Sequence, residues 1–162
     1  MSLSKIIIIV IVSGIGLFIL LLVYTLWPAV RNVSDHKAIK RFVSQPLKLK
    51  REASIYFCKP GGYRFVEHVL SEENPISSEK KYDLPVGSVI TIQKFKTYKS
   101  NAGAGLTDLY ALCEWINVHN EKTEFEYYWG GTDPSFYLKE SAVLPMALWQ
   151  EHTDELIRYE EE

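Results

Sequence analysis

The chain has 162 residues, of which 47% are hydrophobic and 13% are aromatic, and its formal net charge is −2. Residues 28–51 hold seven Lys or Arg side chains against one Asp, whereas residues 52–162 hold 10 basic and 19 acidic side chains. The acidic distal region would repel phosphates, which excludes nucleic acid as a partner, and its length suits one folded domain.

Residues 6–27 form an uncharged, proline-free run that follows a five-residue tail, 1–5. As a helix, this run would be about 33 Å long, enough for a hydrocarbon core of about 30 Å. It exceeds the apolar region of a cleaved signal peptide, which has about 7–15 residues. The run therefore predicts a single transmembrane helix, retained as a signal-anchor in the lipid bilayer of a plasma or inner membrane.

Two arguments about orientation oppose each other. Lys5 precedes the apolar run, whereas Arg31, Lys37, Lys40 and Arg41 follow it, and this excess favours a cytoplasmic domain. A very short tail before a long apolar run is instead typical of an uncleaved export signal. We favour the second argument slightly, which places the domain outside the cytoplasm.

Residues 28–46 form a basic juxtamembrane linker with one short predicted helix. Ser34 is suited to cap it, Ile39, Phe42 and Val43 would share one face, and Pro46 would end it. We expect this helix to link the membrane span to the domain.

From residue 47 to residue 140, the hydrophobic period changes to two, which predicts antiparallel strands. The alternation favours strands at 53–58, 63–70, 88–98, 106–118, 123–129 and 136–138, with a polar loop at 71–83. Phe95 interrupts the alternation of its strand, which suggests a bulge. Short strands between Gly- and Pro-rich turns predict a small antiparallel barrel or sandwich, either SH3-like or OB-like.

Residues 141–162 predict a C-terminal amphipathic helix with an acidic tail. Pro145 suits the first helical position, and Met146, Trp149, Leu156 and Ile157 would form its apolar stripe. The predicted fold class is therefore mainly β, with a transmembrane helix, a short linking helix and a C-terminal helix.

Cys58 and Cys113 match no metal-binding or redox spacing. They would form a disulfide if their strands were neighbours, and two separate buried thiols are an equally good interpretation. The four histidines lie far apart in the sequence, and no nucleophile or phosphate-binding motif is present. We therefore predict no metal site, no cofactor and no enzymatic activity.

Aromatic density is the most informative feature of the domain, with 10 Tyr, seven Phe and four Trp in the chain. Tyr and Trp are enriched at binding hot spots, although bulky rings also fill small β cores. The predicted binding face lies on the strand at 123–129 and its neighbour, and Tyr128 is its expected exposed member. Its residues are Tyr110, Glu124, Glu126, Tyr127 and Tyr128.

These features predict a membrane-anchored, non-catalytic module that binds a protein partner. An accessory protein or an immunity-type inhibitor of a bacterial envelope has this layout, and the acidic domain would prefer a basic partner surface. The alternative is a membrane-bound hydrolase that uses strand carboxylates. Its candidate carboxylates are Glu114, Glu124, Glu126 and Asp133.

Overall fold

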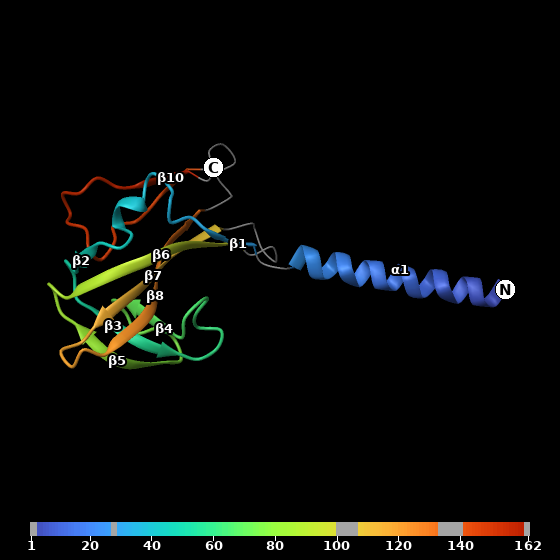
Figure 1. The fold of residues 1–162 in the computed structure, drawn as a ribbon, viewed down its shortest axis with the longest axis horizontal. Coiled ribbons are helices and arrows are strands. Elements are labelled where there is room, and N and C mark those ends of the chain that lie inside the picture. The colour runs from blue at the N-terminus through green and yellow to red at the C-terminus, as the bar shows by residue number, and fades with distance from the viewer. Residues whose placement is uncertain (1–2, 27–28, 100–106, 133–140, 161–162) are drawn as a thin grey trace.

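The computed structural model of the protein describes residues 3–26, 29–99, 107–132 and 141–160, and the chain is mainly β (Figure 1). Helix α1 covers Leu3–Leu26, and a 3-10 turn covers Lys40–Phe42. The strands are β1 (Ala29–Asn32), β2 (Pro46–Lys48), β3 (Ala53–Cys58), β4 (His68–Ser71), β5 (Ser78–Leu84), β6 (Val89–Lys99), β7 (Thr107–Ile116), β8 (Lys122–Thr132), β9 (Ser141–Val143) and β10 (Arg158–Glu160).

The membrane span predicted at 6–27 requires correction. Within the described residues, no helix combines the length and the apolar character that crossing a membrane requires. This finding contradicts the predicted transmembrane helix, the signal-anchor and the single-pass membrane localisation.

Eight strands form one sheet in the order β1-β6-β7-β8-β4-β3-β5, and β2 also pairs with β6. The pairs are antiparallel except for β4 and β8, which run parallel where Val69 lies opposite Glu126. A separate two-stranded sheet joins β9 and β10. The predicted small antiparallel barrel or sandwich, SH3-like or OB-like, is therefore replaced by one large mixed sheet.

Strand β6 organises the sheet because both halves of its edge are paired. Its first residues pair with β2 and its last residues pair with β1, so two short strands share one long neighbour. The register between β6 and β7 shifts between Ile92 and Lys94. The bulge that the interrupted alternation predicted in this strand is thus confirmed near residue 93, and it leaves Phe95 fully buried in the core.

The predicted helix of the linker is reduced to the 3-10 turn Lys40–Phe42. Ser34 does not cap this turn, because its hydroxyl bonds to Asn32 Oδ1 at 2.6 Å and accepts the Phe95 N–H at 2.9 Å. The turn instead follows Ile39, whose side chain is fully buried. Tertiary hydrogen bonds and burial of Ile39 thus outweigh the local helical pattern.

The predicted C-terminal helix is also wrong, because the described part of 141–162 contains short strands and turns. Three of the carbonyls that a helix would use accept hydrogen bonds from elsewhere in the chain. Pro145 O accepts from Trp129 Nε1, Met146 O from the Arg51 guanidinium, and Leu148 O from the Lys50 N–H, each at 2.8 Å. The segment packs on the sheet as irregular chain, with Leu144, Leu148 and Trp149 buried.

The two faces of the sheet are covered differently. The main core lies on one face, around Trp129, Phe95 and Phe125, and it includes the C-terminal segment. We call the opposite side the outer face, and its residues follow from the cross-strand pairs. They are Lys94, Lys96 and Tyr98 on β6, Asp108, Tyr110 and Leu112 on β7, and Glu126 and Tyr128 on β8.

Candidate functional site

The outer face brings together three of the five residues predicted for the binding face. Tyr110 lies directly opposite Tyr128, and Leu112 lies opposite Glu126, so these side chains project from the same side of β7 and β8. Glu124 lies further along the same side, exposed and 3.2 Å from Lys122 Nζ. Tyr127 projects from the other side, and its ring centroid is 5.3 Å from that of Trp149 in the core.

The segment between β3 and β4, residues 59–67, lies against the outer face and is anchored there by Glu126. The Glu126 side chain is buried, and its carboxylate accepts the backbone N–H groups of Arg64, Phe65 and Val66 at 2.8, 2.6 and 3.1 Å. A buried carboxylate is costly unless its oxygens are hydrogen-bonded, and successive backbone N–H groups form an anion-binding concavity. Glu126 therefore fixes the position of this segment and is not available to a ligand.

Phe65 completes a continuous series of four rings on the outer face, which we call the aromatic row: Tyr98, Phe65, Tyr110 and Tyr128. The centroid distances along the row are 6.5 Å for Tyr98 and Phe65, 5.5 Å for Phe65 and Tyr110, and 5.4 Å for Tyr110 and Tyr128. Tyr110 is buried at its centre, whereas Tyr128 at one end exposes 50% of its surface. The row is therefore packed at its middle and most exposed at Tyr128.

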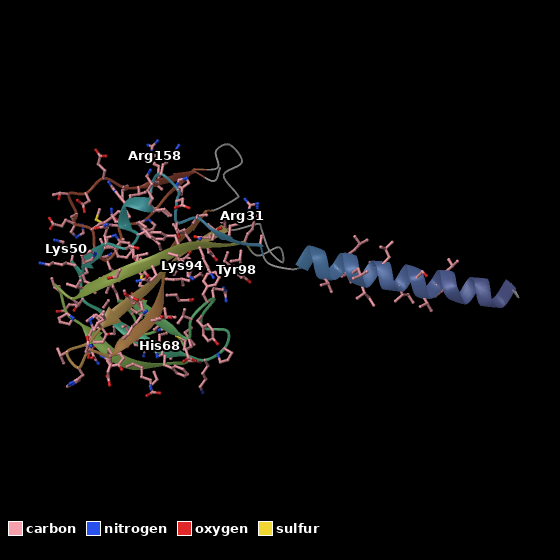
Figure 2. All side chains as sticks on the ribbon, in the orientation of Figure 1. Arg31, Lys50, His68, Lys94, Tyr98 and Arg158 are labelled. Carbon is pink, nitrogen blue, oxygen red and sulfur yellow. The ribbon has the colours of Figure 1, made fainter. Side chains whose placement is uncertain are left out.

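Two cations lie on this row. The Arg64 guanidinium is 5.2 Å from the ring centroid of Tyr98, and Lys96 Nζ is 4.7 Å from that of Phe65. Both distances fall within the range of cation–π interactions. Lys94 is exposed two residues before Lys96, and Figure 2 shows Lys94 and Tyr98 along β6.

Asp108 is the acidic group at the Tyr128 end of the row. The Tyr128 hydroxyl lies 3.5 Å from Asp108 Oδ1, and a Cβ on Gly131 would come within 2.7 Å of the same oxygen. Burial raises the pKa of the Asp108 carboxyl, while the positive charge of Arg64 and the Tyr128 hydroxyl act in the opposite direction. Because Gly131 has no side chain, the Asp108 carboxyl and the Tyr128 hydroxyl can occupy this space.

Burial also dominates the pKa values of the tyrosines in and near the row. It raises the pKa of Tyr110 well above its ordinary value, and the nearby charge of Asp108 adds to the effect. It raises the pKa of Tyr127 to about 12 in the core. These hydroxyls are therefore protonated at neutral pH and act as neutral hydrogen-bonding groups.

The carboxylates proposed for a hydrolase do not form one site among the described residues. Glu114 and Glu124 lie opposite each other, but Lys122 Nζ joins them at 2.7 and 3.2 Å. Glu126 is committed to the backbone of 64–66, and Asp133 lies outside the described residues. No specific observation favours the hydrolase over a binding function.

Cys58 and Cys113 are both buried free thiols. Two strands, β8 and β4, separate their strands in the sheet, and Cys113 alone belongs to the main core. At about 4.8 Å per strand, this spacing is too wide for a disulfide. Burial raises the pKa of both thiols, and the Glu126 carboxylate contributes to the shift at Cys58.

A pocket of about 320 Å³ lies on the C-terminal segment, away from the aromatic row. Its walls are Lys50, Arg51, Met146, Gln150, Glu151 and His152. Lys50 is paired with Glu151 at 2.6 Å, and Arg51 is paired with Glu72 at 2.8 Å. Its principal cations are therefore already committed to neighbours.

Sequence reasoning missed Phe65, Arg64 and Lys96 as members of the site. The alternation of Lys94, Lys96 and Tyr98 around the buried Phe95 was a usable signal for one side of β6. The position of Phe65 had no such signal, because residues 63–67 resemble a strand in sequence but lie outside the strands of the sheet.

Comparison of the chain with protein-family models, with curated proteins and with solved structures finds no match.

Proposed function

We propose that this protein is a non-catalytic binding module that recognises a protein partner through the outer face of its sheet. It would act as an accessory or inhibitor protein, by occupying a surface of its partner. The observation that carries this proposal is the aromatic row with its half-exposed end residue, Tyr128.

The physical reason lies in the cost of ordering side chains on binding. A ring that is already packed against its neighbours loses little conformational freedom when a partner covers it. Tyr128 packs on Tyr110, and Tyr110 packs on Phe65, which is held by the backbone bonds to Glu126. Tyr and Arg, which meet here, are the residue types that dominate hot spots.

The test begins with a photo-crosslinking amino acid in place of Tyr128 in the full chain, expressed in cells of its source. The captured partner is then purified, and its affinity for the unmodified chain is measured by calorimetry. Tyr128→Ala should weaken binding by about tenfold or more, as truncation of a hot-spot residue does.

Ile76→Ala is the matched control, because Ile76 exposes 93% of its surface in the loop between β4 and β5. It removes an exposed apolar side chain outside the outer face and should leave the affinity unchanged. The proposal would be contradicted if Tyr128→Ala and Ile76→Ala weakened the affinity equally. It would also be contradicted if Tyr128→Ala left the affinity unchanged. A third contradicting result would be a catalytic activity that is lost in Glu114→Gln or in Glu124→Gln.

A further inference from the structure

Among the residues that the structure describes, three cations on or against the outer face form no ion pair, whereas five cations elsewhere in the fold do. Lys50, Arg51, Lys80, Lys81 and Lys122 each form an ion pair of 2.6 to 2.9 Å. Among the described residues, no carboxylate lies within ion-pair distance of Arg64, Lys94 or Lys96. Their charge is therefore available to a partner.

The aromatic row holds two of these cations in place without consuming their hydrogen-bond donors. Arg64 stacks on Tyr98, and Lys96 lies over Phe65, so each contacts a ring face. A guanidinium on a ring face keeps its N–H groups free at its edge, and an ammonium keeps three donors. Stacked cations of this kind are pre-positioned for carboxylate recognition.

The acidic groups of the outer face do not cancel this charge. The Glu126 carboxylate is turned to the backbone of 64–66 and is buried. Asp108 is half-buried beside Tyr128, and the charge of Arg64 opposes the rise in its pKa that burial causes, without the two groups forming an ion pair. This end of the outer face is thus locally cationic, although residues 52–162 as a whole are acidic.

We infer that the β6 side of the outer face binds an extended acidic segment of a protein partner. The inference rests on the proposed function and names the chemistry of its partner, replacing the basic partner surface that the net charge predicted. Lys94 and Lys96 would receive two carboxylates, and Tyr98 with Arg64 would receive an aromatic side chain.

The spacing along β6 sets the pattern of that segment. Lys94, Lys96 and Tyr98 occupy alternate positions on one side of the strand, so successive side chains are about 6.6 to 6.8 Å apart. Alternate residues of an extended peptide have the same spacing. The segment should therefore carry Asp or Glu at its first and third positions and a ring at its fifth.

The test uses the full chain and a fluorescein-labelled peptide with glutamate at positions one and three, tyrosine at position five and serine between them. Fluorescence anisotropy should report saturable binding that weakens when NaCl is raised from about 50 to about 300 mM, since salt screens exposed charges. The combined variant Lys94→Glu/Lys96→Glu should weaken binding by about tenfold or more. If this variant fails to fold, Lys94→Gln/Lys96→Gln tests the same contacts.

Lys80→Glu/Lys81→Glu is the matched control, because it makes the same change of charge on β5, at the far edge of the sheet. It should change peptide affinity by less than about twofold, the scale of a long-range charge effect. Equal losses in the two double variants would overturn the inference. So would equal binding of a peptide with adjacent glutamates, or tighter binding of an oligothymidylate of the same charge.

The captured partner separates the inference from the proposed function. Partner binding that depends on Tyr128 but ignores Lys94→Glu/Lys96→Glu would overturn the acidic segment and leave the binding module standing. If neither Tyr128→Ala nor Lys94→Glu/Lys96→Glu changes the affinity for the partner, the binding module and the acidic segment are both overturned. If Tyr128→Ala and Lys94→Glu/Lys96→Glu each weaken binding of the partner, the result supports the proposed function and the inference.

Discussion

At the scale of single residues, Glu126 has the greatest structural effect on the site. It is a buried carboxylate whose charge is stabilised by three backbone N–H groups, and it forms no ion pair among the residues that the structure describes. Hydrogen bonds to a charged group contribute about 1.5 to 3 kcal/mol each. The same bonds position Phe65 and Arg64, so one residue connects the stability of the fold with the shape of the outer face.

Glu126→Gln tests this role, because it keeps the size of the side chain and turns one acceptor into a donor that faces backbone N–H groups. We expect the free energy of unfolding to fall by about 2 to 3 kcal/mol, measured by urea denaturation. Glu124→Gln, an exposed carboxamide substitution on the same strand, should change it by less than about 0.5 kcal/mol. Similar effects from the two variants would show that the backbone bonds contribute little.

The cysteines give a second prediction at this scale. Because burial raises the pKa of both thiols, little reactive thiolate exists in the folded chain near neutral pH. We expect both to react with an aromatic disulfide reagent only when the protein unfolds, with Cys113 slower than Cys58. Rapid native-state modification of Cys113, followed by absorbance, would contradict the packing of the core.

At the scale of elements, β8 depends on a glycine where the C-terminal segment crosses it. Gly130 has φ of 142°, and a Cβ there would lie 2.8 Å from Pro145 Cδ. Trp129 donates its indole N–H to Pro145 O at 2.8 Å beside this contact. The close approach of the C-terminal segment to β8 therefore requires a residue without a side chain.

Gly130→Ala should lower the free energy of unfolding by about 2 to 4 kcal/mol, which combines overpacking with an unfavourable backbone conformation. Gly87→Ala is the control, because Gly87 also has a positive φ, 91°, but a Cβ there meets nothing within 4 Å. That change should cost about 1 to 2 kcal/mol, the backbone contribution alone. Equal losses, measured by thermal and urea unfolding, would argue against the contact with Pro145.

At the scale of the whole molecule, the buried tyrosines make stability depend on alkaline pH. Burial raises the pKa of Tyr127 from 10.0 to about 12, and it raises the pKa of Tyr110 further. The unfolded chain therefore releases these protons at lower pH than the folded chain does. Their contribution is fully present below pH 10 and is lost as the pH rises through the folded-state pKa.

For Tyr127 alone, this linkage predicts a loss of about 2 kcal/mol in the free energy of unfolding between pH 9 and pH 12. Urea unfolding at several pH values measures the slope, and Tyr127→Phe should reduce it. A slope that the substitution leaves unchanged would mean that Tyr127 is accessible to solvent. Absorbance of tyrosinate in the folded chain provides an independent reading of the same proton.

The sequence alone predicted those elements whose residues alternate strongly. The patterns at 53–58, 88–98, 106–118 and 123–129 correspond to β3, β6, β7 and β8, because a half-buried strand needs apolar side chains on every second residue. Tyr110, Glu126 and Tyr128 could be placed on one side for the same reason. Local pattern also identified the Gly- and Pro-rich turn after residue 58.

The tertiary structure decided what depends on partners far along the chain. The irregular C-terminal segment, the parallel pairing of β4 with β8 and the strand β5 within a polar stretch have no local signal. The approach of Phe65 to Tyr98 and Tyr110 depends on Glu126, about 60 residues away along the chain. Periodicity determines which side of a strand a residue faces, whereas long-range hydrogen bonds and packing determine which segments meet there.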